Sequence, residues 1–360
     1  MSVLGFGVQR LPLEIDEAES IGMLRYAIDH GVNYLDLGCL YDLEQQERLL
    51  RVVTQALEDG YRQKVKIAAS LPSLFINTSA DLERYLDQKL EWLKAGSVDF
   101  FLLGELDRYS WPRLKELGVL AWAEGAMTDV RIGKLGFSFH DHFQILRGIL
   151  DDYDGWTLSQ FQFSYMDADC QPGVSGLKLA ADRGLAVVAA EPLRGGRLTK
   201  KPPASVAKVW ATASQKRPLA EWGLRWVWDH PEVATAVSDM STLAQVKENV
   251  AFADKAKPGS LTVADEVLIA QVRDAYRKLK PIPCTTCHGC MPCPLGINVP
   301  RLFELYNDAV MYGDMETVQA IYRREGHDID SCNQCGLCVC GREIPILDWL
   351  KELSGALAKE

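Results

Sequence analysis

The feature that most constrains the fold is an alternation of short β-rich runs with helix-length segments over residues 1–256. Strands that alternate with helices favour parallel pairing, because a parallel connection needs a long crossover. The runs expected to form strands are Val3–Val8, Asn33–Leu37, Val65–Ala69, Val98–Leu103, Gly133–Ser138, Thr157–Phe163, Leu185–Ala190 and Val233–Val237.

The segments between these runs carry apolar residues at helical spacing. In Asp16–His30, for example, Ile21, Leu24 and Ile28 fall on one face. Eight strand–helix units in about 250 residues predict a (β/α)8 TIM barrel. The alternative is an open doubly wound sheet, but no Gly-x-Gly-x-x-Gly turn follows the first strand. The other expected helices are Asp81–Ala95, Trp111–Thr128, Phe143–Tyr153, Val174–Arg183, Leu219–His230 and Thr242–Ala253.

The C-terminal ends of the strands are where a (β/α)8 barrel carries its chemistry. Candidate functional residues are therefore those that directly follow each β-rich run. They are Asp36–Tyr41, Ser70, Gly104–Glu105, Ser138–His142, Gln160, Glu191–Gly196 and Ser238–Ser241.

Cysteine usage sets the C-terminal part of the chain apart. Eight of the ten cysteines lie between Cys284 and Cys340, whereas a disulfide scaffold would spread them and would need an oxidising compartment. Three cysteines at x₂ spacing can hold a [4Fe–4S] cluster, and the fourth of each run ligates the other cluster in two-cluster ferredoxins. The predicted sets are Cys284, Cys287, Cys290 and Cys340 for one cluster, and Cys332, Cys335, Cys338 and Cys293 for the other.

The second cysteine run departs from the usual ending, because Cys338-Val339-Cys340-Gly341 is two residues shorter than C-x₃-C-P and lacks the proline. Zinc is the alternative metal, since paired C-x₂-C also suits tetrahedral sites. We expect two domains, a barrel over residues 1–280 and a mainly helical, ferredoxin-like iron–sulfur domain over residues 281–360. Within the second, Val299–Tyr312 and Met315–Arg324 are expected to be helices.

Charge and hydropathy exclude several classes of partner. The 39 basic and 49 acidic side chains give a net charge of −10, which disfavours nucleic acid and anionic membranes. No apolar run approaches the roughly 18 residues of a membrane-spanning helix. The stretch Met1–Gly7 lacks the basic and apolar regions of a signal peptide. A cytoplasmic protein is expected.

Several stretches, taken in order, resemble the aldo/keto reductase family, in particular its branch with a C-terminal two-cluster ferredoxin-like domain. The branch also has an Ile-Pro-Ile sequence, present here as Ile344–Ile346, which supports Cys340 as the displaced fourth ligand. The resemblance implies an oxidoreductase and covers nearly the whole chain. The stretches are Leu4–Gly7, Ala27–Asp36, Gly136–His140, Glu191–Gly196 and Glu248–Asn249.

The family's reductases have an Asp, Tyr, Lys and His tetrad around the substrate carbonyl. Asp36 and Tyr41 match it, but Ser70 stands at the Lys position and Gly104 at the His position. A tyrosine has a pKa near 10 without a neighbouring cation, and acid–base assistance is worth about 10²–10⁴-fold. Ordinary carbonyl reduction should therefore be nearly abolished. His140 is a candidate replacement acid; alternatively, Asp36 and Tyr41 are inherited barrel residues without a proton-transfer role.

The resemblance also implies a site for NADP or NAD. Ser138 and Gln160 would hold the nicotinamide carboxamide. Asp239 stands where the family has glycine, and its carboxylate would repel a 2′-phosphate; alternatively, the loops keep the family shape without the ligand. The pyrophosphate would lie on Glu191, Pro192, Leu193, Arg194, Gly195 and Gly196, and the adenosine end beside Ser238, Met240, Gln245, Glu248 and Asn249.

The sequence thus predicts an iron–sulfur oxidoreductase that transfers electrons between two [4Fe–4S] clusters and a small molecule in the barrel, with or without NAD(P)H. A second interpretation is a repurposed barrel without nicotinamide, acting as a cluster-driven reductase or as the electron-transfer subunit of a larger complex. A third is a zinc-stabilised interaction protein with an inactive barrel. The partners expected are a small-molecule substrate and a redox protein.

Overall fold

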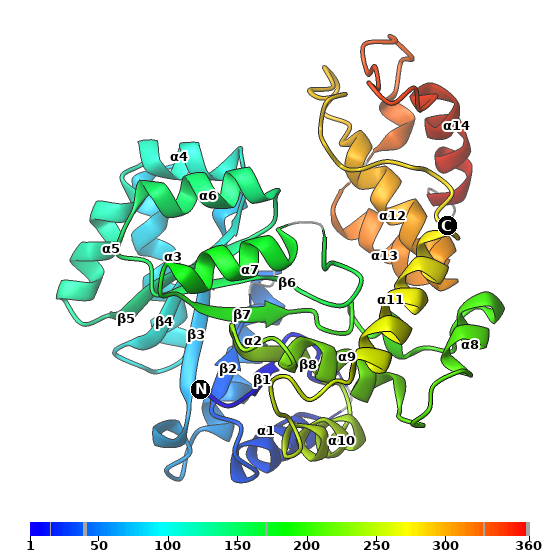
Figure 1. Ribbon diagram of the computed structural model, residues 1–360. Helices are drawn as coiled ribbons and strands as arrows, with labels where there is room; N and C mark the ends of the chain where they lie inside the picture. The colour runs from blue at the N-terminus through cyan, green and yellow to red at the C-terminus, as the bar shows by residue number, and fades with distance from the viewer. Residues whose placement is uncertain (15, 39–41, 170–171, 327, 358–360) are drawn as a thin grey trace. The chain divides into compact units, whose positions relative to one another are not determined.

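The computed structural model describes residues 1–14, 16–38, 42–169, 172–326 and 328–357 (Figure 1). The chain divides into two compact units. One consists of Met1–Gly196 with Arg217–Thr262, and the other of Arg197–Lys216 with Val263–Glu360. Among the described residues, no helix is both long enough and apolar enough to cross a membrane.

The first unit is built on a closed barrel of eight parallel strands, each paired with the next in sequence and β8 with β1. This confirms the predicted (β/α)8 barrel and excludes the open sheet. Each strand overlaps the run from which it was predicted. The strands are β1 (Leu4–Gly7), β2 (Tyr34–Asp36), β3 (Lys66–Leu71), β4 (Val98–Leu106), β5 (Ile132–Phe139), β6 (Leu158–Gln162), β7 (Ala186–Ala190) and β8 (Val233–Asp239).

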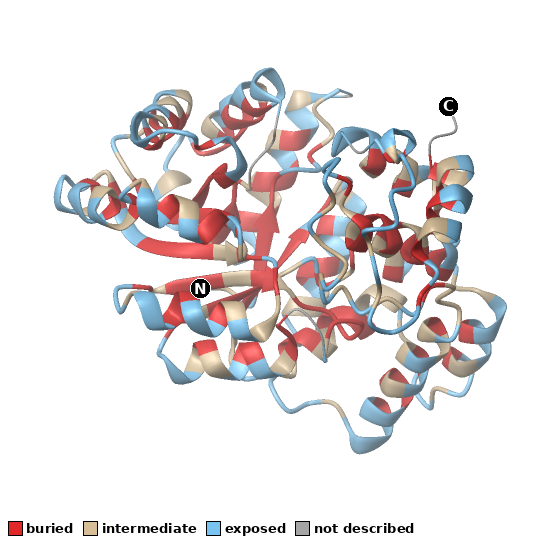
Figure 2. Ribbon diagram, turned by 90° about the horizontal axis from the view of Figure 1, so that it is seen from above, coloured by how far each residue is buried: buried red, intermediate tan, exposed pale blue. Residues whose placement is uncertain are grey.

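Helices cover the outside of this barrel, with their buried faces toward the strands and their exposed faces outward (Figure 2). The helix expected over Trp111–Thr128 is two helices, because Gly118 between them adopts a left-handed conformation with φ of 76°. The helix α2 was not predicted. The helices of this unit are α1 (Glu17–Asp29), α2 (Leu43–Ala56), α3 (Ser79–Trp92), α4 (Ser110–Glu116), α5 (Val119–Thr128), α6 (Phe143–Asp152), α7 (Gly173–Asp182), α9 (Leu219–Trp228) and α10 (Leu243–Ala253), with short 3₁₀ turns at Arg62–Lys64 and Ser73–Phe75.

The second unit is helical. Its helices α12 and α13 have the bounds that the sequence predicted, and the helix α11, which precedes residue 280, packs with this unit rather than with the barrel. Arg197 pairs with Asp308 at 3.1 Å, and Lys200 with Asp314 at 2.7 Å. These pairs fasten the segment 197–216 to α12 and to the turn before α13. The elements are α8 (Ala204–Trp210), α11 (Val263–Arg277), α12 (Val299–Tyr312), α13 (Met315–Arg324) and α14 (Ile346–Leu357), with 3₁₀ turns at Arg197–Thr199 and Ile329–Ser331.

Candidate functional sites

Inside the barrel, buried apolar side chains from β2, β3, β4, β6, β7 and β8 pack against one another. Side chains alternate between the two faces of a strand, so the residue two positions further along each strand also points inward, toward the C-terminal mouth. This places Asp36, Ser70, Gly104, Gln160 and Asp239 in one ring. The apolar layer below it is Tyr34, Ala68, Leu102, Leu158, Val188 and Val237.

Asp36 is the most buried acid of this ring, with 5% of its surface exposed. Its Oδ1 accepts a hydrogen bond from the Gly38 amide at 2.9 Å, and its Oδ2 accepts one from Gln160 Nε2 at 2.8 Å. Burial raises the pKa of Asp36, and the two hydrogen bonds partly oppose that rise. The structure therefore brings Asp36 and Gln160 together across the barrel. Tyr41 lies outside the described residues.

Gly104 is closely packed by the neighbouring strand. A β-carbon at this position would come within 2.4 Å of the Leu71 carbonyl oxygen. Just beyond it, the pairing of β4 with β5 shifts register, and Glu105 takes a left-handed φ of 53°. The Glu105 amide then donates to Ser138 Oγ at 2.7 Å. The position where the resemblance expects histidine thus lacks room for a side chain as well as the imidazole itself.

Asp239 leans over the neighbouring glycine of β1. Gly7 pairs with Asp36 on one side and with Asp239 on the other, and a β-carbon on Gly7 would lie 2.2 Å from Asp239 Oδ1. Asp239 is exposed to solvent, but protein atoms around its carboxyl group reduce the hydration of that group. Desolvation, followed by the carboxylates of Asp36 and Glu191, raises the pKa of Asp239 to about 6, while the Arg10 guanidinium opposes the rise.

The loop after β7, Glu191–Gly196, is a compact turn. Its backbone is left-handed at Glu191, Arg194, Gly195 and Gly196. The Arg194 side chain is buried and pairs with Asp167, so its guanidinium serves the fold of the loop. Arg10, which sequence reasoning did not single out, donates from Nη1 to the Gly195 carbonyl at 3.0 Å. No motif marked Arg10; its place after the first strand was the only signal.

The predicted adenosine-side residues gather where β8 meets α10. Asn249 Nδ2 donates to Ser238 Oγ at 3.1 Å, and the Ser241 amide donates to Gln245 Oε1 at 2.8 Å. Met240 is buried, and Glu248 is exposed on α10.

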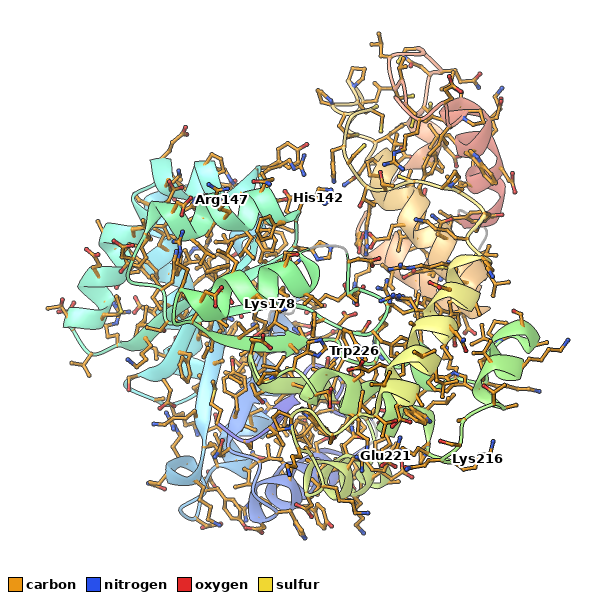
Figure 3. All side chains as sticks on the ribbon, in the orientation of Figure 1. His142, Arg147, Lys178, Lys216, Glu221 and Trp226 are labelled. Carbon is orange, nitrogen blue, oxygen red and sulfur yellow. The ribbon has the colours of Figure 1, made fainter. Side chains whose placement is uncertain are left out.

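His140 has an exposed side chain after β5, and its amide donates to the Leu106 carbonyl at 3.0 Å. The next residue, Asp141, is buried and accepts from Arg108 Nε at 2.8 Å. Despite burial, Arg108 and two backbone amides hold the pKa of Asp141 below its usual range. His142 follows at the start of α6 (Figure 3). The loop is anchored by Asp141, which leaves the His140 imidazole at the surface.

In the second unit, eight free cysteines line two hollows. The first is lined by Cys293, Cys332, Cys335 and Cys338, and the second by Cys284, Cys287, Cys290 and Cys340. Each hollow thus receives three cysteines from one run and one from the other. Within the described part of the chain, no three Cys, His, Asp or Glu side chains converge on the position of a single metal ion.

Apolar side chains form part of the wall of each hollow, and in the second hollow two backbone amides donate to cysteine sulfur atoms. The Thr286 amide donates to Cys284 Sγ and the Arg342 amide to Cys340 Sγ, both at 3.4 Å. Burial raises the pKa of Cys290 to about 11, whereas the Gly289 amide lowers the pKa of the exposed Cys287. The apolar walls are Ile297, Val299, Leu347 and Leu350 in one hollow, and Pro300, Phe303, Ile344 and Ile346 in the other.

The sequence model of the aldo/keto reductase family matches residues 3–258, which include every strand of the barrel. The chain belongs to the aldo/keto reductase family. A search of curated protein sequences found no match to this chain.

Solved structures of aldo/keto reductases share the barrel at low sequence identity. The holo form of AKR11C1 from Bacillus halodurans is 23% identical, with a TM-score of 0.62 over 75% of this chain and 91% of that one. An enzyme from Klebsiella pneumoniae in complex with NADPH is 19% identical, with a TM-score of 0.61 over 75% and 90%. The thermostable Tm1743, in complex with the inhibitor epalrestat, is 20% identical, with a TM-score of 0.60 over 76% and 95%.

Proposed function

We propose that this aldo/keto reductase family member is an iron–sulfur oxidoreductase. Two [4Fe–4S] clusters held by residues 281–360 would exchange electrons with a small molecule in the barrel mouth, and a nicotinamide dinucleotide would bind at the same mouth. The observation that carries the proposal is the pair of hollows, each lined by four cysteines drawn from both runs.

The donor set of each hollow fits a cluster. Four cysteine thiolates are the ligand set of a [4Fe–4S] cluster, and hydrogen bonds to sulfur and solvent exposure are among the properties that set its potential. In the second hollow the amides of Thr286 and Arg342 supply such bonds, and in both hollows apolar side chains lie beside the cysteines. Cys284, Cys287, Cys290 and Cys340 would hold one cluster, and Cys293, Cys332, Cys335 and Cys338 the other.

The barrel mouth offers a partial fit to a nicotinamide. Gln160 Oε1 is buried and has no hydrogen-bond partner among the described residues, and it lies beside Ser138 on the adjacent strand. These two groups would bind the carboxamide. A Klebsiella pneumoniae relative of the same fold was solved with NADPH, which supports a dinucleotide at this mouth.

The clusters supply single electrons when bound, and the nicotinamide a hydride. The chain's own residues would bind and orient the substrate within the ring above Tyr34 and deliver its proton. Tyr41 and His140 are the proposed donors. Ser70 and Gly104 stand where the family tetrad has lysine and histidine, so neither side chain would assist a proton transfer from Tyr41.

A second candidate is a barrel that works without nicotinamide, as a cluster-driven reductase or as part of a larger electron-transfer complex. The observation that favours it is the cluster of acids at the mouth. The carboxylates of Asp36 and Glu191 raise the pKa of Asp239, and the Arg10 guanidinium lowers it. A pyrophosphate on the loop after β7 would meet Glu191 directly. Electrons would then come from a redox protein.

Anaerobic purification followed by iron, sulfide and zinc analysis tests the clusters. We expect about eight iron and eight sulfide per chain; stoichiometric zinc without iron would contradict the proposal. Titration with NADPH and NADH, followed by reduction with a low-potential donor, separates the two candidates. Binding of either dinucleotide supports the first, whereas cluster reduction without dinucleotide binding supports the second.

A further inference from the structure

The hydrogen bond between Gln160 and Asp36 fixes which way the Gln160 amide faces. An ionised carboxylate only accepts hydrogen bonds, so the NH₂ group of Gln160 must face Asp36. The 2.8 Å distance from Nε2 to Oδ2 agrees with this. The amide oxygen is consequently turned away from Asp36, and it is the buried atom without a partner among the described residues.

Asp36 can bind Gln160 because, among the described residues, no lysine acts on its carboxylate. Its neighbour on β3 is Ala68, and the next inward residue of that strand is Ser70, which is short and uncharged. Both Asp36 oxygens are engaged, one by the fixed amide of Gly38 and the other by Gln160. A cation at position 70 would draw the carboxylate away from Gln160.

Ser138 lies beside Gln160 in the register of β5 and β6. Its Oγ already accepts from the Glu105 amide at 2.7 Å. A hydroxyl has one donor and two acceptor positions, so the Ser138 proton is available to donate. An acceptor on Gln160 thus lies next to a donor on Ser138, which is the complement of the NH₂ and C=O of a primary carboxamide.

We propose that Asp36 is a positioning residue in this chain, which holds the Gln160 amide with its oxygen toward the carboxamide of a bound nicotinamide. This inference rests on the proposed nicotinamide site. It gives Asp36 a role through Gln160 that does not depend on a neighbouring lysine or on proton transfer.

Asp36→Asn is the decisive change, because it is isosteric and reverses the polarity of one contact. Gly38 presents a fixed N–H, so the Asn oxygen must face Gly38 and its NH₂ must face Gln160. The Gln160 amide then flips and presents NH₂ to the carboxamide NH₂. The net value of one neutral hydrogen bond is about 0.5–1.5 kcal/mol, so we expect the Kd for NADPH and NADH to rise about 2- to 13-fold.

The experiment is a double-mutant cycle on the whole, anaerobically prepared protein, with Kd measured by quenching of tryptophan fluorescence. Asp36→Asn, Gln160→Leu and the double variant are compared. If Asp36 acts through Gln160, the double variant binds no more weakly than Gln160→Leu alone. Additive losses, or an unchanged Kd in Asp36→Asn, overturn the proposal. Asp129→Asn at the exposed end of α5 makes the same charge change and should leave Kd unaltered.

A second ligand reports the orientation directly. In the 3-acetylpyridine analogue of NADH a methyl group replaces the carboxamide NH₂. The unmodified protein should discriminate against this analogue, and Asp36→Asn should reduce that discrimination; equal discrimination in both overturns the proposal. Should Asp36→Asn fail to fold, Ser70→Lys draws Asp36 from Gln160 and should reduce discrimination likewise. If the unmodified protein binds neither NADPH nor NADH, the nicotinamide site itself fails, before any variant is compared.

Discussion

Replacing Gly104 by alanine is expected to destabilise the barrel, whereas the same change at Gly148 is not. Gly148 lies within α6, and a β-carbon there would meet nothing within 4 Å. At Gly104 the β-carbon would lie 2.4 Å from the carbonyl oxygen of Leu71 and 3.5 Å from its carbonyl carbon. The obstacle is backbone of the adjacent strand, which cannot rotate away as a side chain can.

The magnitude follows from the displacement that is needed. To restore a 3.0 Å contact, the two strands must separate by about 0.6 Å, the difference between 3.0 and 2.4 Å. Forcing extra atoms into a packed core costs about 1–3 kcal/mol. Removing a glycine also stabilises both variants by roughly 0.5–1 kcal/mol through the unfolded chain. Because that gain is common to both, the difference between them isolates the steric cost, about 1–3 kcal/mol.

The measurement is urea unfolding of the two variants and the unmodified protein, followed by tryptophan fluorescence and far-ultraviolet circular dichroism. Thermal unfolding should show Gly104→Ala melting about 2–12 °C below Gly148→Ala. Equal stability of the two variants would refute the reasoning, since it would mean that β3 and β4 separate without cost. The result bears on function, because histidine at this position needs the same space and more.

Three further predictions follow from the sites. Cys293→Ser should lower the iron content from about eight to about four per chain. The spectrum of its remaining cluster should match that of Cys335→Ser, and a match to Cys290→Ser would contradict the grouping of Cys293 with the second run. Folding raises the pKa of Asp239 from 3.8 to about 6, so the protonated carboxyl favours the folded state. That contribution to the free energy of unfolding is lost as pH rises from 3.8 through about 6. At pH 8 the free energy of unfolding of Asp239→Asn should therefore exceed that of the unmodified protein by about 1 kcal/mol, and at pH 4 the two should be equal; solvent exposure reduces the effect from the roughly 3 kcal/mol of the full pKa shift. Greater stability of Asp239→Asn at pH 4 as well would count against this reasoning. Turnover of simple aldehydes with NADPH should be slower by orders of magnitude than in relatives with the complete tetrad; a comparable rate would show that Tyr41 needs no assistance.

The fold could be predicted from the sequence because strand and helix periodicities were strong over residues 1–256. The break in the expected Trp111–Thr128 helix at Gly118 was missed, since a glycine within an apolar pattern does not by itself reveal a left-handed backbone. The division between units also depends on tertiary contacts. Residues 197–216 join the helical unit through Arg197 and Lys200, and ion pairs between distant segments leave no local pattern.

The site could be predicted only as far as strand ends identify residues. The contact of Gln160 with Asp36 links positions 124 residues apart, and no spacing rule brings them together. The same holds for Arg10, which follows β1 and donates to the Gly195 carbonyl in the loop after β7. This contact is apparent only when the fold brings the two loops together. The grouping of the cysteines into two sets could be predicted from the sequence, because the spacing within each run limits which cysteines can lie together.

The exchange of the fourth cysteine between the two hollows makes the two runs interdependent. Cys293 lines the hollow of the second run, and Cys340 lines the hollow of the first. A chain without one of the runs would therefore have no hollow with four cysteines. The helices α12 and α13 lie between the two cysteine runs in the sequence. Deleting either run therefore removes cysteines from both hollows.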